Sequence, residues 1–207
     1  MSRPAARRTI ENAVRRLGFA RVAGVDEVGR GSLAGPVVVA AVVLDPTRGI
    51  AGLRDSKLLT SAARDRLFDQ IVAHAAAWTL AAADPHEVDR LNVHRASLRA
   101  MQQAVTQLVP LPDFVLVDGF RIPGLFIPQR HVVKGDRKCA AIAAASILAK
   151  VTRDRQMQAL HVEDPRYGFD RHKGYATRAH LAAVARFGYS AVHRRSFRPA
   201  SLFDRIG

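Results

Sequence analysis

A chain of 207 residues with 48% hydrophobic content can bury one sizeable core, and it is too short for two independent cores. Its 32 Lys and Arg residues outnumber 18 Asp and Glu residues, and the resulting net charge of +14 predicts a polyanionic partner such as nucleic acid. The single cysteine, Cys139, excludes an internal disulfide and favours a reducing compartment, the cytoplasm, while no apolar run reaches the ~20 residues of a membrane span.

The N-terminal part of the chain predicts a hairpin, a helix and a third strand. Residues 21–25 and 37–44 are mostly apolar and rich in valine, and a glycine-rich loop connects them. Thr60 or Ser61 can cap a helix that continues to about residue 77. Residues 78–83 are then expected to form the third strand.

The central part predicts two helices and a buried strand. Asp84-Pro85 opens a short helical segment, and residues 93–108 have the apolar spacing of a longer helix that ends before Pro110. Residues 114–117 are an apolar run without a polar face, so the strand predicted there is buried on both sides.

The C-terminal part predicts mostly helix. Residues 126–133 are consistent with an extended segment, residues 140–161 with an alanine-rich helix, and residues 177–187 with a further helix. No internal repeat, low-complexity segment or linker interrupts the chain. We therefore expect one compact α/β domain over residues 1–207, with a C-terminal helical part from about residue 160 packed on it.

Two of the apolar segments end on an aspartate, Asp26 and Asp118. Ligands of parallel sheets bind at the carboxyl ends of the strands. If these two strands are neighbours, the ~4.8 Å strand spacing brings the aspartates close enough to share metal ions. Together with Glu27 they suit a hard divalent cation such as Mg²⁺. Turn formation at a strand end is the alternative for each aspartate alone.

A glycine-flanked arginine follows these acids directly. Gly29 and Gly31 permit backbone angles and close approaches that a Cβ would block. Arg30 offers a planar cationic fork for a phosphate, and the adjacent amides can donate to a ligand oxygen. The loop therefore predicts an anion site beside the acids.

Ser146, Lys150 and Asp154 recur every four residues on the alanine-rich helix. This spacing aligns them on one face, which could point at the metal site. Asp154 is then either a further metal ligand or the partner of Lys150 in an ion pair on the helix surface. The spacing alone leaves both alternatives open.

The positive charge is concentrated in the C-terminal part. Residues 121–207 hold 17 Lys and Arg residues against 6 Asp and Glu residues, whereas residues 1–120 hold 15 against 12. We expect this part to contact a nucleic-acid backbone without reading its sequence. A basic surface that only aids solubility is the alternative interpretation.

Several short motifs follow one another in order along most of the chain. They are Asp26-Glu27-x-Gly29-Arg30-Gly31, Leu33-Ala34-Gly35-Pro36, Asp55-Ser56-Lys57, Val117-Asp118-Gly119, Lys134-Gly135-Asp136, Ala144-Ala145-Ser146-Ile147-Leu148-Ala149-Lys150 with Arg153-Asp154, His172-Lys173-Gly174-Tyr175 and His193-Arg194-Arg195-Ser196-Phe197. In this order the set resembles the bacterial type 2 ribonuclease H family, ribonuclease HII. Val28 departs from the family pattern, in which alanine is common at this position.

The resemblance implies an RNase H-like fold, with a mixed five-stranded sheet flanked by helices and additional C-terminal helices. It implies an endoribonuclease that hydrolyses the RNA strand of RNA/DNA hybrids and incises DNA at embedded ribonucleotides. A two-metal mechanism with Mg²⁺ or Mn²⁺ would leave 3′-hydroxyl and 5′-phosphate ends.

The resemblance also assigns roles to residues by their position. The metal-binding and catalytic acids would be Asp26, Glu27, Asp118 and Asp154. Gly29, Arg30 and Gly31 resemble the loop that recognises the ribose 2′-hydroxyl, and Tyr175 resembles the tyrosine that contacts the ribonucleotide at the RNA–DNA junction. The predicted substrate-binding set is completed by Lys134, Ser146 and Lys150.

Two other functions explain part of the sequence. A non-catalytic nucleic-acid-binding protein would account for the charge but not for the two aspartates at strand ends. Another nuclease of the RNase H-like superfamily, such as a transposase or resolvase, would place acids at strand ends but does not require the glycine-arginine loop beside Glu27. For the enzyme itself we expect a monomer with no obligate protein partner.

Overall fold

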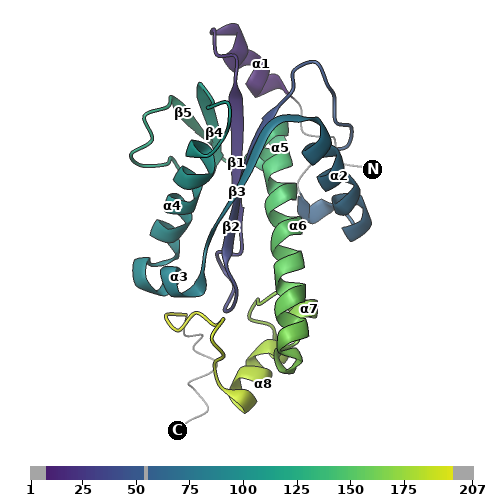
Figure 1. Ribbon diagram of the computed structural model, residues 1–207, viewed down its shortest axis with the longest axis vertical. Helices are drawn as coiled ribbons and strands as arrows, with labels where there is room; N and C mark the ends of the chain where they lie inside the picture. The colour runs from purple at the N-terminus through teal and green to yellow at the C-terminus, as the bar shows by residue number, and fades with distance from the viewer. Residues whose placement is uncertain (1–7, 54–55, 198–207) are drawn as a thin grey trace.

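The computed structural model describes residues 8–53 and 56–197, which form a five-stranded sheet with helices on both faces (Figure 1). One face is covered by α6 with α2 beside it, and the other by α4 with α3 packed against it. No helix within these residues is long and apolar enough to span a bilayer. The elements are α1 (Thr9–Arg16), β1 (Val22–Val28), β2 (Val37–Leu44), the 3-10 helix η1 (Ser56–Leu58), α2 (Ser61–His74), β3 (Ala75–Ala83), α3 (Pro85–Leu91), α4 (Val93–Thr106), β4 (Phe114–Asp118), β5 (Gln129–Val132), α5 (Gly135–Lys138), α6 (Ala140–Glu163), the 3-10 helix η2 (Pro165–Tyr167), α7 (Phe169–His172) and α8 (Arg178–Phe187).

The sheet has the strand order β3-β2-β1-β4-β5. β1 pairs with β2, and β2 with β3, in antiparallel orientation, whereas β1–β4 and β4–β5 are parallel. The predicted α/β fold with a mixed five-stranded sheet is therefore confirmed. The hairpin predicted between residues 21 and 44 is the antiparallel β1–β2 pair.

Side chains of β1 alternate between two hydrophobic cores, one on each face of the sheet. Val22 belongs to the core beneath α6, and Ala23 and Val25 belong to the core beneath α4. Gly24 faces α6, where a Cβ would lie 2.2 Å from the carbonyl carbon of Ala141. Glycine at this position therefore lets the N-terminal turn of α6 lie directly against the strand that carries Asp26.

The boundary predicted between the second helix and the third strand is wrong. The helix ends at His74, and residues 75–77 belong to β3. Alanine has the highest intrinsic helix propensity, which is why this alanine-rich stretch predicts helix. Pairing of Leu44 with Ala75 and of Val43 with Ala77 satisfies the backbone of these residues in the sheet and overrides that preference.

β1 is longer than predicted. Its pairing with β2 continues to Val28 and Val38, whereas its pairing with β4 stops at Val25 and Val117. Asp26 therefore lies inside a strand at the point where one of its two neighbours ends, and the turn-forming alternative for Asp26 is wrong. The remaining predicted helices and strands are found within a few residues of their expected positions.

Beyond α6, the C-terminal helices enclose a small core of their own. Tyr167, Phe169 and Val184 pack with Met157 of α6 and with Ala34 of the loop after β1. The backbone of that loop also bridges to this region, since Ser32 pairs with Tyr175 and Ala34 with His193. The C-terminal helices are therefore attached to the loop that follows the acids as well as to α6 (Figure 1).

Two buried histidines form a hydrogen-bonded chain in this region. The amide of Ser190 donates to His193 Nδ1 at 3.0 Å, so the proton of a neutral His193 lies on Nε2, which is 3.0 Å from His180 Nε2. His180 Nδ1 then donates to the carbonyl of Tyr175 at 3.0 Å. Burial, as the main cause, lowers the pKa of each ring to about 4.

These lowered pKa values predict a loss of stability in mild acid. The unfolded chain, with ordinary histidine pKa values near 6.5, binds more protons than the native state between pH 6.5 and 4. The free energy of unfolding should therefore fall as the pH drops through this window, by roughly 3 kcal/mol or less per ring. Urea unfolding at pH 7, 6 and 5 measures the slope, which His180→Gln should flatten. The same change at the exposed His86 should leave the slope as it is, and equal slopes for the wild type and His180→Gln would contradict the prediction.

Candidate active site

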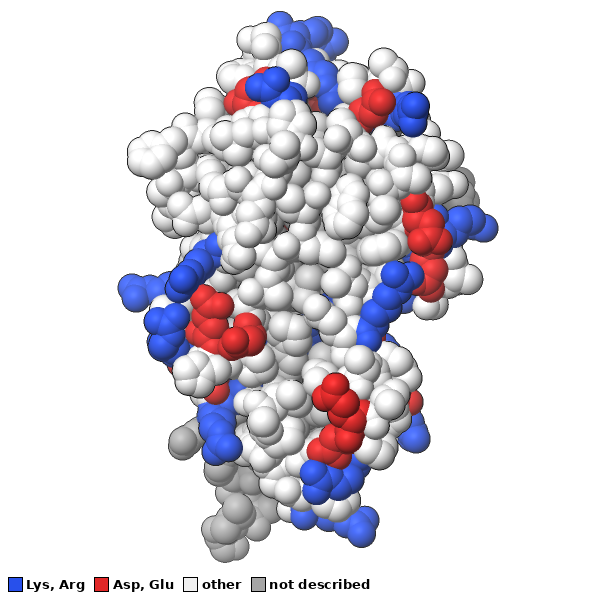
Figure 2. Space-filling model, in the orientation of Figure 1, with Lys and Arg blue, Asp and Glu red and all other residues white. Residues whose placement is uncertain are grey.

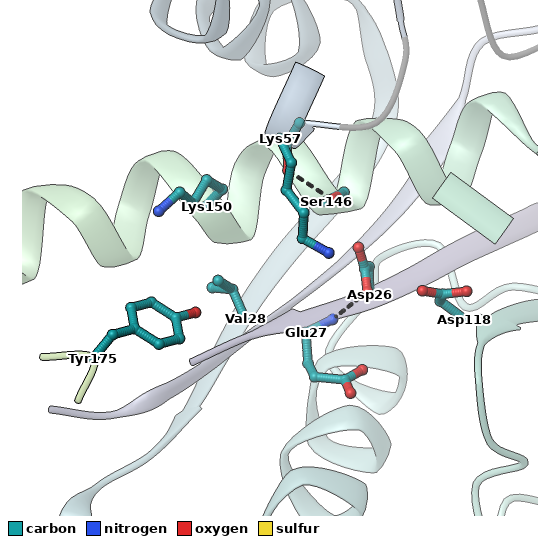
Figure 3. A pocket seen from close by; sticks show the side chains of 9 residues that line it. Asp26, Glu27, Val28, Lys57, Asp118, Ser146, Lys150 and Tyr175 are labelled. Atoms are coloured by element: carbon teal, nitrogen blue, oxygen red, sulfur yellow. Dashed lines mark hydrogen bonds between the residues drawn. The ribbon is translucent and has the colours of Figure 1, made fainter. Parts of the chain in front are cut away.

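Asp26 and Asp118 lie side by side because β1 and β4 are parallel neighbours in register. Val25 and Val117 form the last pair of that ladder. Asp26 and Asp118 are the next residues of the two strands, so they lie level with each other at the end of the ladder. Both aspartates line one pocket, and Figure 3 shows their carboxylates close together. The prediction that these two strands are neighbours is confirmed.

The Asp26 carboxylate is strongly destabilised in its charged form. The residue is only 7% exposed, and burial, followed by the negative charges of Glu27 and Asp118, raises its pKa well above the usual value. Hydrogen bonds from the Ser146 hydroxyl and from the Glu27 amide, the latter at 2.8 Å, oppose this shift. A buried carboxylate with acidic neighbours is stabilised by a divalent cation, and the oxygen donors present here fit a hard one.

Asp118 is held by the turn that leads into α5. Its Oδ1 accepts a hydrogen bond from the amide of Gly135 at 2.8 Å. A Cβ at Gly135 would lie 2.5 Å from Ile142 Cδ1 and 3.3 Å from the Asp118 carboxylate, so glycine permits this approach. Lys134, which precedes it with φ 56°, is exposed and is not among the residues that line the pocket.

Glu27 lines the pocket but points away from the two aspartates (Figure 3). Neighbouring residues of a strand face opposite sides of the sheet, and the Glu27 carboxylate accepts a hydrogen bond from Arg30 Nη1 at 3.0 Å. Burial raises its pKa, and Arg30 opposes that shift. Consequently, among the described residues, no three His, Cys, Asp or Glu side chains gather closely enough to hold a metal ion.

Cationic and hydroxyl groups face the acids across a pocket of 520 Å³. Figure 3 shows the ammonium group of Lys57 pointing toward Asp26. The hydroxyls of Ser56 and Ser146 lie 3.0 Å apart behind it. Acids on the sheet and lysines opposite them form a site that can bind an anionic phosphate together with cations. The lining residues are Asp26, Glu27, Val28, Ser56, Lys57, Asp118, Ser146, Lys150 and Tyr175.

Asp154 does not line this pocket. Its Oδ1 accepts a hydrogen bond from Lys150 Nζ at 2.7 Å, and it lines a separate hollow of 150 Å³ with Arg64 and Lys173. The structure therefore contains the ion pair that the helical spacing allowed. Its partner Lys150 does line the main pocket.

The glycine loop after β1 is tightly packed at one end and open at the other. Gly29 has φ 92°, and a Cβ there would lie 2.3 Å from Arg153 Nε, whereas a Cβ at Gly31 would meet nothing within 4 Å. We expected Arg30 to offer its guanidinium to phosphate. In the structure it pairs with Glu27, and its guanidinium carbon lies 5.2 Å from the centre of the Phe120 ring.

The structure adds three pocket residues that were not among the predicted site residues. Ser56 and Lys57 belong to a motif quoted above, in which Asp55 lies outside the described residues, and only that motif pointed to them. Val28 lines the pocket as the last residue of β1, and its departure from the family pattern was the only signal. Phe120, beside Arg30, gave no signal in the sequence because an isolated phenylalanine in a loop is not diagnostic.

Charged side chains are sparse on the face shown in Figure 2. Lys and Arg lie mainly along its margins, and the centre of this face is largely uncharged. A duplex needs a continuous basic surface along its phosphates. The face shown in Figure 2 does not offer such a surface.

Comparison with known families identifies the kind of enzyme to which this site belongs. A family model described as Ribonuclease HII matches residues 23–200. The chain belongs to the ribonuclease HII family. A curated Ribonuclease HII from Nitrosococcus oceani is 55% identical over 183 residues, which cover 88% of this chain and 91% of that protein. The chain is thus a metal-dependent endoribonuclease that hydrolyses phosphodiester bonds in RNA/DNA hybrids, and the alternative of a non-catalytic binding protein is wrong.

Solved structures of ribonuclease H2 and HII have the same fold. The ribonuclease H2 from Pyrococcus horikoshii OT3 matches with a TM-score of 0.73 and 25% identity, over 90% of this chain and 98% of that chain. The RNase HII from Archaeoglobus fulgidus, solved in complex with PCNA, matches with a TM-score of 0.72 and 26% identity, over 87% and 96% of the two chains. The RNase H-like fold implied by the motifs is confirmed.

Proposed function

We propose that this ribonuclease HII also incises duplex DNA at a single embedded ribonucleotide, leaving 3′-hydroxyl and 5′-phosphate ends. The observation that carries the proposal is the register of β1 and β4, which sets Asp26 and Asp118 side by side next to the glycine loop. Asp26, Glu27 and a loop suited to reading one sugar lie in a single continuous segment, residues 26–31, and the fold brings Asp118 beside it. Recognition of one ribonucleotide and hydrolysis beside it therefore require no other domain.

We propose Asp26, Glu27, Asp118 and Asp154 as the acids that bind the divalent cations, Mg²⁺ or Mn²⁺. The raised pKa of buried Asp26 supports this role, because a cation stabilises its charged form. Two bound divalent cations supply the charge that stabilises the attacking and leaving oxygens of an in-line displacement. For Asp154 the role requires its bond to Lys150 to exchange for a cation, which frees the Lys150 ammonium group for a phosphate oxygen.

Recognition of the ribose is assigned to Gly29, Arg30, Gly31 and Tyr175. The backbone amides of residues 29–31 make no backbone hydrogen bond to any other described residue, so they remain available to a substrate. The 2′-hydroxyl is the group that distinguishes RNA from DNA at one nucleotide. Tyr175 lines the pocket, is 38% exposed and offers an aromatic face to a sugar or base.

The remaining proposed contacts hold the substrate backbone. Ser146 and Lys150 line the pocket from α6, and Lys134 is exposed on the turn beside Asp118. Such contacts fix the position of a duplex without reading its sequence. We propose further that residues 1–207 act as one catalytic domain, as a monomer, and in the cytoplasm, where the single cysteine stays reduced.

Cleavage of matched duplexes tests the proposal. An end-labelled DNA duplex with one ribonucleotide should be cut next to that ribonucleotide in Mg²⁺ or Mn²⁺, whereas the all-DNA duplex of the same sequence should remain intact. A hybrid with a continuous RNA strand serves as the positive control, and chelation of the metal should stop every reaction. Cleavage of the hybrid without cleavage of the one-ribonucleotide duplex would refute the proposal.

A further inference from the structure

Two arginine side chains are completely buried behind the glycine loop. Arg153 of α6 and Arg194 of the C-terminal segment are both 0% exposed. Neither forms an ion pair with a carboxylate of the described residues; backbone carbonyls and a serine hydroxyl accept their hydrogen bonds instead. Burial and the charge of Arg153 lower the pKa of Arg194 to about 10. A buried cation without an anion is costly, and such costs persist where a function requires them.

Arg194 binds two carbonyls of the loop with three nitrogen atoms. Nε and Nη2 both donate to the carbonyl of Gly35, at 3.0 and 2.8 Å, and Nη1 donates to the carbonyl of Arg30 at 2.9 Å. The Arg194 amide also donates to the carbonyl of Leu33 at 2.8 Å. One residue therefore fixes both ends of the loop that begins with the predicted ribose-recognition residues.

The bond to Arg30 is the one that matters for recognition. Arg30 is the central residue of Gly29-Arg30-Gly31. Among the described residues, the only hydrogen bond to its backbone is the one that its carbonyl accepts from Arg194. With the carbonyl fixed, the orientation of the peptide plane between Arg30 and Gly31 is fixed as well. The amide of Gly31, which belongs to that plane, is among those left available to a substrate.

The segment that carries Arg194 is itself attached to helix α3. Asp89 of α3 accepts hydrogen bonds from the amides of Arg195 and Ser196, at 2.8 and 2.9 Å, and from the Ser196 hydroxyl at 2.5 Å. These three bonds hold the backbone next to Arg194. Docking of the C-terminal segment is thus coupled to the conformation of the loop.

We propose that Arg194 is a positioning residue for ribose recognition: it holds the Arg30 carbonyl from behind, so that the backbone of residues 29–31 is set to meet the 2′-hydroxyl. This inference rests on the proposed function of the loop. Lysine cannot replace the arginine, because a single ammonium group lacks the planar fork that reaches Gly35 and Arg30 together. The residue touches neither the acids nor the pocket, so its effect should fall on recognition rather than on binding of the DNA backbone.

Arg194→Lys tests the proposal against a variant that is destabilised elsewhere. The matched control is Ile71→Ala, which truncates a fully buried side chain of α2. Ile71 belongs to the hydrophobic core beneath α6. For both variants the melting temperature, kcat/KM on the one-ribonucleotide duplex and Kd for the uncut all-DNA duplex are measured, at a temperature where both are folded. Arg194→Lys should lower kcat/KM at least about tenfold with Kd within about twofold of wild type, and Ile71→Ala should change neither value by more than about twofold.

Wild-type kcat/KM in folded Arg194→Lys, or an equal loss in Ile71→Ala, would overturn the proposal. If Arg194→Lys does not fold, Asp89→Asn is tested in its place. Asp89 is only half-buried, and its replacement weakens the hydrogen bonds that hold the same segment. Asp89→Asn should lower kcat/KM by about threefold or more at unchanged Kd, and wild-type kcat/KM in that variant would likewise overturn the proposal. Failure of the wild type to cut the one-ribonucleotide duplex would instead refute the proposed function.

Discussion

Asp26→Asn is expected to lower metal-dependent cleavage of an RNA/DNA hybrid by roughly 10³-fold or more, without lowering stability. Asparagine keeps the shape and the oxygen that accepts from the Glu27 amide, but it removes the charge that would bind a cation. Because burial and two acidic neighbours make that charge unfavourable, its removal should leave the melting temperature equal or higher. Single-turnover cleavage and thermal unfolding without metal measure the two effects.

Parallel changes at the other acids separate their roles. Asp118→Asn should lose a similar share of activity, and its Oδ1 can still accept from the Gly135 amide. Asp154→Asn should match these losses if Asp154 binds a cation, whereas a loss below about tenfold would leave it as the ion-pair partner of Lys150. Asp45→Asn, just after β2 at the end of the β1–β2 pair that lies away from Asp26, is the control and should retain full activity. Wild-type turnover in Asp26→Asn would remove Asp26 from the metal site.

Hybrid binding by Asp26→Asn should persist. The variant keeps the lysines that line the pocket, and removal of a negative charge reduces repulsion of phosphates. A gel-shift or fluorescence titration at two salt concentrations measures this. Loss of both binding and cleavage would indicate a change in the fold and would contradict the expected stability.

The sequence predicted the meeting of Asp26 and Asp118 because two independent patterns agreed. Both strands are apolar on both faces, which is typical of central parallel strands, and both carry an aspartate at the same point. It could not predict that Glu27 would face the other side of the sheet, since this follows from β1 continuing to Val28. That continuation depends on pairing with β2, a tertiary contact that local composition does not encode.

Long-range hydrogen bonds to backbone atoms were equally invisible in the sequence. In the sequence Arg194 stood out only as a member of a motif within the basic C-terminal part, where an arginine is normally exposed. In the structure it is buried, and it binds carbonyls that lie more than a hundred residues away. Periodicity and capping describe neighbours along the chain, whereas this contact exists only after the C-terminal segment docks on the loop.

Gly31→Ala is expected to lower kcat/KM on the one-ribonucleotide duplex by about 10- to 100-fold while leaving the protein as stable as wild type. A Cβ at Gly31 would meet nothing within 4 Å, and its φ is not in the left-handed region, so the folded protein accommodates alanine. Any loss must then come from a partner that approaches the loop, namely the sugar of the substrate.

The contrast with other glycines isolates that contact. Gly49 has the same two properties, open space and an ordinary φ, so Gly49→Ala should leave both stability and kcat/KM unchanged. Gly29→Ala should lower stability and activity together, because φ 92° and the 2.3 Å approach to Arg153 Nε exclude a Cβ in the folded protein itself. Thermal unfolding and kcat/KM on the one-ribonucleotide duplex therefore separate the three variants. Wild-type kcat/KM in Gly31→Ala would mean that the substrate does not approach the loop at this residue, and ribose recognition would have to rest on Tyr175 instead.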